Sequence, residues 1–238
     1  MTGLRAGQDE PHRWKGNVMR VLLVAPPGAG KGTQGALIAT HFGIPHIATG
    51  DLLRDHVARR TELGRAVQDR LDKGELVPDD VVLDMVRSAF LDAKHSGGGY
   101  VLDGMPRNMQ QARALYEIGL SLGMTANVAL HLKADDEELT RRLLARAALE
   151  RRSDDTEEII RRRLALYHEV THPIIDWYAG RGILVSVDAV RPVDRVARQI
   201  LTALEAMRPL IDHVPEHARR SVDLTGLGAA FGQSPPRG

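Results

Sequence analysis

A glycine-rich stretch, APPGAGKGTQ at residues 25–34, lies between the apolar run VMRVLLV and a periodic segment that begins GALIATHFG. Its alternating glycines let successive backbone N–H groups point at one anion, and the positive end of a following helix adds to the attraction. Lys31 supplies a point charge, and the Thr33 hydroxyl can reach a magnesium ion. The stretch therefore predicts a cradle for the β- and γ-phosphates of a nucleotide, formed by Gly28, Ala29, Gly30, Lys31, Gly32 and Thr33.

One position departs from the usual G-x-x-x-x-G-K pattern, because the first glycine is replaced by Ala25. If the backbone needs a positive φ there, we expect strain at that residue. A glycine-rich turn can also serve only as a tight connection. Gly-x-Gly-Lys-Gly-Thr directly after an apolar strand is nevertheless specific enough to favour phosphate binding.

Arginines at several further positions could bind a second phosphorylated ligand. Phosphoryl transfer between two nucleotides needs both polyanions held in line and the charge of the transition state spread over cations. Arg54 in DLLR and Arg107 in DGMPR each follow a predicted strand, where a guanidinium can bind a phosphate through two hydrogen bonds. A solvated surface position is the alternative for each. A second group of arginines forms a basic concentration further along the chain, and some of its members must belong to the solvated face that charge runs usually form on amphipathic helices: Arg142, Arg146, Arg151, Arg152, Arg161, Arg162 and Arg163.

Asp103 closes the apolar run GGGYVLD, from where its carboxylate could hold water bound to magnesium beside Thr33. A role in a turn is the alternative. If the second ligand accepts a phosphoryl group on a phosphate oxygen, no general base is needed, because that oxygen is already ionised at neutral pH. We therefore expect the histidines in the neighbourhood of these motifs to be structural or surface residues: His46, His56, His131, His168 and His172.

Short apolar runs and long periodic segments alternate along the chain, and the runs lie at 18–24, 45–48, 100–104, 126–132 and 183–189. Strands that are apolar on both faces and alternate with helices indicate a parallel sheet with right-handed crossovers. The sequence therefore predicts a doubly wound α/β fold with five parallel strands and helices on both faces. Helix starts are predicted at 79–80, 135–136, 156 and 192. Ligands of such folds bind at the carboxyl edge of the sheet, where the motifs above all fall.

Composition narrows the possible functions. The chain has 238 residues, 43% of them hydrophobic, which excludes disorder throughout, and its formal charge of +1 offers no basic excess for nucleic acid or an anionic membrane. It has no cysteine, so disulfides and cysteine-based zinc sites are excluded and a reducing cytosol is suitable. No apolar run reaches the roughly 18 residues of a membrane span. Met19, just before the first apolar run, could be an alternative translation start.

The segments PGAGKGTQ, HIATGDLLR, GELVPDD, LDGMPR, RRSDD and RRRL occur in the order and spacing of the nucleoside monophosphate kinases, and the chain resembles the adenylate kinases most among them. The resemblance covers residues 19–207 and implies a P-loop kinase domain. Within it, a helical monophosphate-binding region is expected at about 48–78 and a short lid at about 146–155, since only AALER separates Arg146 from Arg152. Residues 1–18 would be an extension and 208–238 a flexible tail.

The resemblance implies reversible transfer of a phosphoryl group from magnesium-bound ATP to AMP by a cytoplasmic monomer, with no zinc and with closure of both mobile regions. It also implies a cis bond before Pro106. The residues expected to carry the chemistry are Lys31, Asp103, Arg107, Arg142, Arg146, Arg152 and Arg163, with Thr33 and Asp103 facing magnesium. Arg151, Arg161 and Arg162 are expected to be solvated. The phosphate-loop residues with Arg142, Arg146 and Arg191 would bind ATP. The expected AMP site comprises Thr49, Arg54, Glu75, Leu76, Val77, Gly104, Arg107, Gln111, Arg152 and Arg163.

The choice of monophosphate rests on few residues. Gln111 and Thr49 agree with adenylate kinases, whereas Asn108 is common in UMP/CMP kinases and Met105 replaces the usual Phe. AMP is therefore the expected acceptor, with UMP or CMP as the alternative. Two other classes stay open: a regulatory module that binds a nucleotide without catalysis, which the complete arginine set disfavours, and a P-loop ATPase acting on nucleic acid, which 4% aromatic content disfavours.

Overall fold

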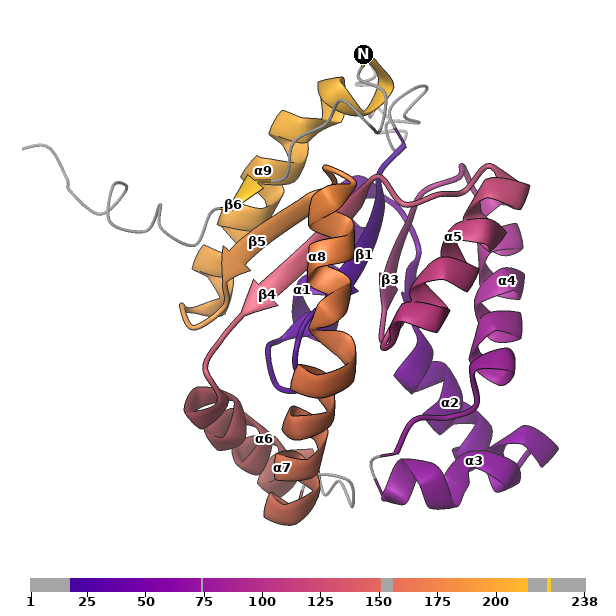
Figure 1. Cartoon of the computed structure of the whole chain (residues 1–238), viewed down its shortest axis with the longest axis vertical. Helices are drawn as coiled ribbons and strands as arrows, with labels where there is room; N and C mark the ends of the chain where they lie inside the picture. Colours follow the sequence, from indigo (N-terminus) through magenta and orange to yellow (C-terminus); the bar gives the residue numbers. More distant parts are fainter. Residues whose placement is uncertain (1–17, 74, 151–155, 214–221, 224–238) are drawn as a thin grey trace, which may run out of the picture.

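The computed structural model describes residues 18–73, 75–150, 156–213 and 222–223, and within them it forms a parallel sheet with helices on both faces (Figure 1). The strands are β1 (Arg20–Val24), β2 (His46–Ala48), β3 (Tyr100–Asp103), β4 (Val128–Lys133), β5 (Leu184–Asp188) and β6 (Val222–Asp223). Their order across the sheet is β2-β3-β1-β4-β5-β6, and every pair is parallel. This confirms the predicted doubly wound α/β class.

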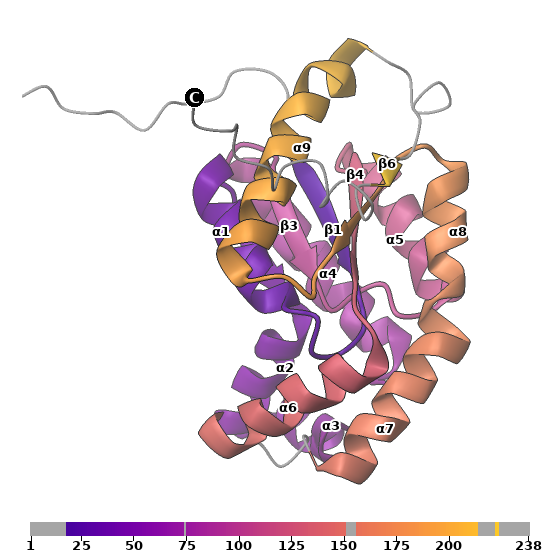
Figure 2. The same ribbon diagram turned by 90° about the vertical axis from the view of Figure 1, so that its left-hand side faces the viewer.

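Helices connect the strands and extend past their carboxyl ends. The bounds are α1 (Lys31–Phe42), α2 (Thr49–Ala58), α3 (Glu62–Asp72), α4 (Asp79–His95), α5 (Met109–Leu122), α6 (Asp136–Glu150), α7 (Glu157–Leu166), the π-helical turn η1 (Tyr167–Thr171), α8 (Pro173–Gly180) and α9 (Val193–His213). Figure 1 and Figure 2 both show α2 with α3, and α6 with α7, beyond the carboxyl edge of the sheet.

The central strands are buried on both faces because their residues alternate between two apolar clusters. Leu22 and Val24 of β1 face the cluster formed with α4, α5 and α8, whereas Val21 and Leu23 face the cluster formed with α1, α6, α7 and α9. All four side chains are at most 2% exposed. This double burial explains why the strands are continuous apolar runs in the sequence.

Local signals set several helix ends. The side chains of Thr61, Asn108 and Thr156 accept hydrogen bonds from backbone N–H groups in the first turns of α3, α5 and α7. Gly43 and Gly123 end α1 and α5 in the left-handed conformation. The predicted helix starts at 79–80, 135–136, 156 and 192 are all confirmed to within a residue or two.

The structure differs from the sequence prediction at the C-terminal side. Beyond the five predicted strands, the two-residue β6 pairs with β5, with Val185 opposite Val222. Helix α9 continues to His213, so residues 208–213 and 222–223, which were predicted to belong to a flexible tail, lie in a helix and a strand. Residues 1–17, 151–155, 214–221 and 224–238 lie outside the described residues, and the predicted domain boundaries remain predictions.

Of the helices in the described part of the chain, none is both long and apolar enough to cross a membrane.

Candidate functional site

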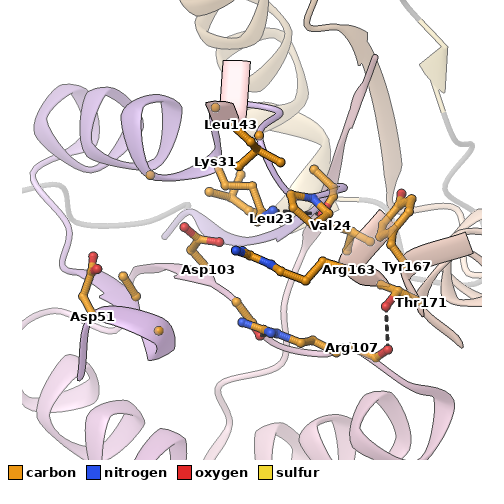
Figure 3. Close-up of a pocket in the computed structure, with 18 of the residues that line it drawn as sticks. Leu23, Val24, Lys31, Asp51, Asp103, Arg107, Leu143, Arg163, Tyr167 and Thr171 are labelled. Carbon is orange, nitrogen blue, oxygen red and sulfur yellow. Dashed lines mark hydrogen bonds between the residues drawn. The ribbon is translucent and has the colours of Figure 1, made fainter. Parts of the chain in front are cut away.

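The predicted motifs meet in a cavity of about 450 Å³ at the carboxyl edge of the sheet (Figure 3). Strands β1 and β3, the loop before α1, and the helices α2, α6 and α7 all contribute to its walls. A smaller cavity adjoins it between α2, α3, α4 and α5. Of the predicted site residues, the larger cavity is lined by Gly28, Gly30, Lys31, Gly32, Thr33, Arg54, Leu76, Asp103, Gly104, Arg107, Arg142, Arg146 and Arg163.

The glycine-rich loop connects the end of β1 to the start of α1. Gly28 and Gly30 have φ of 82° and 87°, which side chains rarely allow. A Cβ on Gly28 would lie 2.9 Å from Cγ of Leu143, so α6 packs directly against the loop. No side chain caps α1 at Gly30, which leaves its first N–H groups available to an anion.

Ala25 does not have the positive φ that would have caused strain. Among the described non-glycine residues only Arg60 has a positive φ, so an alanine at this position costs no backbone strain. Ala25 instead uses its carbonyl oxygen, which accepts a hydrogen bond of 2.9 Å from Nζ of Lys31.

Lys31 is held in the loop by two backbone carbonyls, because its Nζ also donates to the oxygen of Pro26 at 2.9 Å. Burial lowers the pKa of Lys31 from 10.5 to about 8, and the nearby Asp103 carboxylate opposes this shift. The surrounding guanidinium groups of Arg107, Arg163 and Arg146 lower the pKa further. The ammonium group is therefore poised to be stabilised by an incoming phosphate.

Asp103 ends β3 beside the loop, and its Oδ1 is buried without a hydrogen-bond partner. Thr33 lines the same cavity. Mg²⁺ keeps several waters and takes only one or two protein ligands besides substrate phosphates, so one carboxylate and one hydroxyl suit it. No group of three or more acidic or histidine ligands occurs among the described residues.

Three arginines, Arg54, Arg107 and Arg163, line both cavities. Figure 3 shows the Arg163 side chain reaching toward Asp103, with the Arg107 side chain running roughly parallel to it. Arg107 donates from Nε to the Gly104 carbonyl at 2.7 Å, and burial lowers its pKa, as do the charges of Arg163 and Arg54. Cations crowded in this way between two cavities are stabilised by an anion shared by both.

Arg142 projects from α6 and is fixed by several acceptors. Its Nε donates to Glu138 at 2.6 Å and its Nη1 to the carbonyl of Ala189 at 2.9 Å. Hydrogen bonds from Arg141 and Arg142 lower the pKa of Glu138 to about 2, so this carboxylate stays ionised. Arg142 is thereby oriented before any ligand binds.

The smaller cavity contains the remaining residues of the predicted monophosphate site. Thr49 is 1% exposed and donates to the carbonyl of Asp103 at 3.1 Å. Gly104 has φ 89°, and a Cβ there would clash with Oγ1 of Thr49. The predicted residues that line this cavity are Thr49, Arg54, Glu75, Leu76, Val77, Gly104, Arg107, Gln111 and Arg163.

The structure does not bring every predicted residue to these cavities. Arg152, together with Arg151, lies outside the described residues. Among those described, Ala29 of the loop is buried and Arg191 donates a hydrogen bond to Asp188 at 3.3 Å, and neither lines the two cavities. Arg162 is exposed, as expected, and its Nη2 also lies 3.1 Å from Glu75.

The structure also tests the expected cis bond before Pro106 and the expected roles of two histidines. The bond between Met105 and Pro106 is cis, as predicted, and Met105 is 1% exposed. His168 pairs with Asp136 at 2.9 Å at the surface, and the buried His131 lies 3.2 Å from the hydroxyl of Tyr167. These two positions agree with surface and structural roles.

Sequence reasoning missed several residues around the site. Tyr167 and Thr171 of η1 line the larger cavity, and Thr171 donates to the backbone oxygen of Arg107 at 2.7 Å. Asp79 was interpreted only as a helix start, but it contacts Gln111. The contacts of Asp79 with Gln111 and of Thr171 with Arg107 join residues 32 and 64 positions apart, so no local sequence pattern predicts them. The one available signal was that Asp79 directly follows the GELVP segment of the family motif.

A parallel sheet with a phosphate-binding loop after its first strand and arginines between two adjoining cavities defines the class of P-loop nucleotide-binding α/β proteins. A family model described as adenylate kinase matches residues 23–183. The chain therefore belongs to the adenylate kinase family. It is 46% identical over 188 residues to an adenylate kinase of Thermobifida fusca, covering 79% of this chain and 99% of that protein. It is also 42% identical over 184 residues to one of Thermus thermophilus, covering 77% and 96%.

Proposed function

We propose that the protein is a phosphotransferase that moves the γ-phosphoryl group of ATP to AMP, giving two ADP. The observation that carries this proposal is the pair of adjoining cavities that share Arg54, Arg107 and Arg163. A protein that bound one nucleotide would not need a second anion site facing the first. Family membership and the names of the relatives support the same reaction.

In this proposal, each cavity holds one nucleotide. The backbone N–H groups of residues 28–33 and the ammonium of Lys31 bind the β- and γ-phosphates of ATP. Arg54 and Arg107 bind the phosphate of AMP, and Arg163 faces the transferred group from α7. Arg142 and Arg146 of α6 neutralise charge on the ATP side. Arg152, which lies outside the described residues, is expected from the family resemblance to contribute to the same reaction.

The chain's own residues would orient the reactants rather than exchange protons with them. Because the acceptor is an ionised phosphate oxygen, positioning and charge stabilisation carry the catalysis. Asp103 and Thr33 would hold Mg²⁺, largely through water, and the bound ion would neutralise phosphate charge. The buried, unpartnered Oδ1 of Asp103 supports this placement. Closure over both nucleotides would exclude water and so prevent hydrolysis of ATP.

The same reasoning supports narrower proposals on partners. We propose a cytoplasmic monomer that binds ATP, AMP and ADP and neither nucleic acid nor membrane. The formal charge of +1 supports the expectation that nucleic acid and membrane are not bound, and the lack of cysteine suits a reducing cytosol. The monomer is proposed by analogy with short-lid members of the family.

The decisive experiment measures phosphoryl transfer from ATP to AMP, UMP, CMP and GMP, with and without magnesium. We expect the largest kcat/KM for AMP and no transfer without magnesium. A larger value for UMP or CMP would reassign the acceptor, and no transfer to any monophosphate would refute the enzyme. In a parallel measurement, an ATP–AMP mimic that joins two adenosines through five phosphates should raise the melting temperature, since it occupies both cavities.

A further inference from the structure

The amide of Gln111 is buried at the wall of the smaller cavity and has protein partners at both ends. Gln111 is 2% exposed. Its Oε1 accepts a hydrogen bond of 2.7 Å from the backbone N–H of Arg107, and its Nε2 donates one of 2.6 Å to Oδ1 of Asp79. An amide oxygen has two lone pairs and an amide nitrogen two hydrogens. One lone pair and one hydrogen therefore remain for a ligand in the cavity.

Asp79 determines which way this amide faces. A carboxylate only accepts hydrogen bonds, so the group beside it must be the NH2 end of the amide. Asn108 has the same constraint, because its Nδ2 lies 3.3 and 3.2 Å from the two carboxylate oxygens of Asp79. Its Oδ1 in turn accepts from the backbone N–H of Gln111 at 2.7 Å. The three side chains thus form a network in which each orientation supports the next.

The direction of the amide matters for the choice of base. Adenine offers a donor at its exocyclic N6 and an acceptor at the neighbouring ring nitrogen, which match the free oxygen and hydrogen of an amide. Hypoxanthine, the base of IMP, differs only in offering an acceptor at position 6 and a donor at N1. An amide can pair with hypoxanthine in the same place only if it turns over. In this site such a turn would set Nε2 against the Arg107 N–H and Oε1 against the Asp79 carboxylate.

We propose that Asp79, supported by Asn108, is a positioning residue for specificity: it locks the amide of Gln111 in the orientation that accepts a 6-amino purine and rejects a 6-oxo purine. This inference rests on the proposed function, because it requires AMP to be the acceptor. Asp79 acts through Gln111 and does not itself touch the base. Removing it leaves only the backbone N–H of Arg107 to oppose the turn.

The test compares AMP with IMP as acceptors for the parent protein and for Asp79→Ala. We expect the ratio of kcat/KM for AMP to that for IMP to fall at least tenfold in Asp79→Ala, the loss of one hydrogen bond to a charged group. The matched control is Asp80→Ala, because Asp80 is an exposed carboxylate in the same first turn of α4. It removes the same charge from the helix N-terminus and should leave the ratio unchanged.

Two further variants keep the test decisive if Asp79→Ala fails to fold. Asn108→Ser keeps a hydroxyl that can cap α5 but removes the donor to Asp79, and Asp79→Asn keeps the volume but removes the charge. Both should narrow the AMP-to-IMP ratio by a smaller factor, with a melting temperature that shows folding. Equal losses of kcat/KM for AMP and IMP, at an unchanged ratio, would mean a merely structural role and would overturn the proposal. If the parent transfers phosphate to UMP or CMP but not AMP, the proposed function fails; if it prefers AMP and the ratio stays constant, only the lock fails.

Discussion

Replacing Lys31 by methionine should abolish phosphoryl transfer and yet stabilise the nucleotide-free protein. The pKa of Lys31 is lowered from 10.5 to about 8 because the folded structure buries its charge. At 1.36 kcal/mol per pH unit, this corresponds to about 3 kcal/mol of unfolding free energy lost to the charge at pH 7. Methionine has a similar length and carries no charge.

The substitution also removes the two hydrogen bonds to the carbonyls of Ala25 and Pro26. These carbonyls lie at the cavity, where water can replace the ammonium, so their loss costs about 1 kcal/mol each. The expected net effect of Lys31→Met is therefore a gain of about 1 kcal/mol at pH 7. For a domain of this size, that is a rise of about 2–4 °C in melting temperature.

The pH dependence of the stability gained in Lys31→Met tests whether the buried charge of Lys31 is its cause. A lysine whose folded pKa is lower than its unfolded pKa destabilises fully below the folded value, near pH 8, and the penalty disappears as pH rises toward 10.5. The advantage of Lys31→Met should therefore be present at pH 7 and be lost by pH 10. Thermal unfolding followed by circular dichroism at both pH values measures this.

The matched control is Lys94→Met. Nζ of the exposed Lys94 also donates to a backbone carbonyl, that of Leu122 at 2.8 Å, but its charge is hydrated. This variant should show no gain in stability at either pH. A Lys31→Met protein that melts below the parent at pH 7, or whose advantage is the same at pH 10, would refute the assignment of a buried, destabilising charge.

Two further substitutions test the packing of the site and of the core. Gly104→Ala should raise the KM for AMP at least tenfold and lower the free energy of unfolding by about 1–3 kcal/mol, because its φ is 89° and its Cβ would meet Oγ1 of Thr49. The control is Gly123→Ala, whose φ is 67° and whose Cβ would meet no other atom of the described residues. It should lower stability without changing the KM for AMP. Steady-state kinetics with both variants would contradict this if their KM values rose alike. Phe90→Ala should lower the free energy of unfolding in urea by about 3–5 kcal/mol, since Phe90 is fully buried and stacks on Tyr100 at 4.4 Å; a loss below about 2 kcal/mol would mean that the core refills the space.

Much of the site could be predicted because its chemistry is encoded locally. The segment from Gly28 to Thr33 combines a strand end, glycines and a helix start within a few residues, so its conformation depends little on the rest of the chain. Arg54 and Arg107 were predicted in the same way, from short motifs that follow strands. Whether Ala25 is strained could not be decided from the sequence, because the φ of one residue depends on how the loop packs.

Residues far apart in the sequence could be related only by the fold. Nothing near Asp79 indicates that its carboxylate meets the amide of Gln111, since that contact depends on how α4 packs against α5. Arg162 is exposed, as expected, but its pairing with Glu75 could not be predicted, because it depends in the same way on how α7 lies beside the loop before α4.

The amino-acid sequence by itself determined the alternation of strands and helices, the phosphate-binding loop and the family, because hydrophobic periodicity and turn chemistry act over a few residues. The tertiary structure alone decided the depressed pKa of Lys31, the arginines shared between two cavities and the orientation of the Gln111 amide. Burial, electrostatic potential and hydrogen-bond direction depend on groups from distant positions in the sequence, and these groups come close to one another only when the chain has folded.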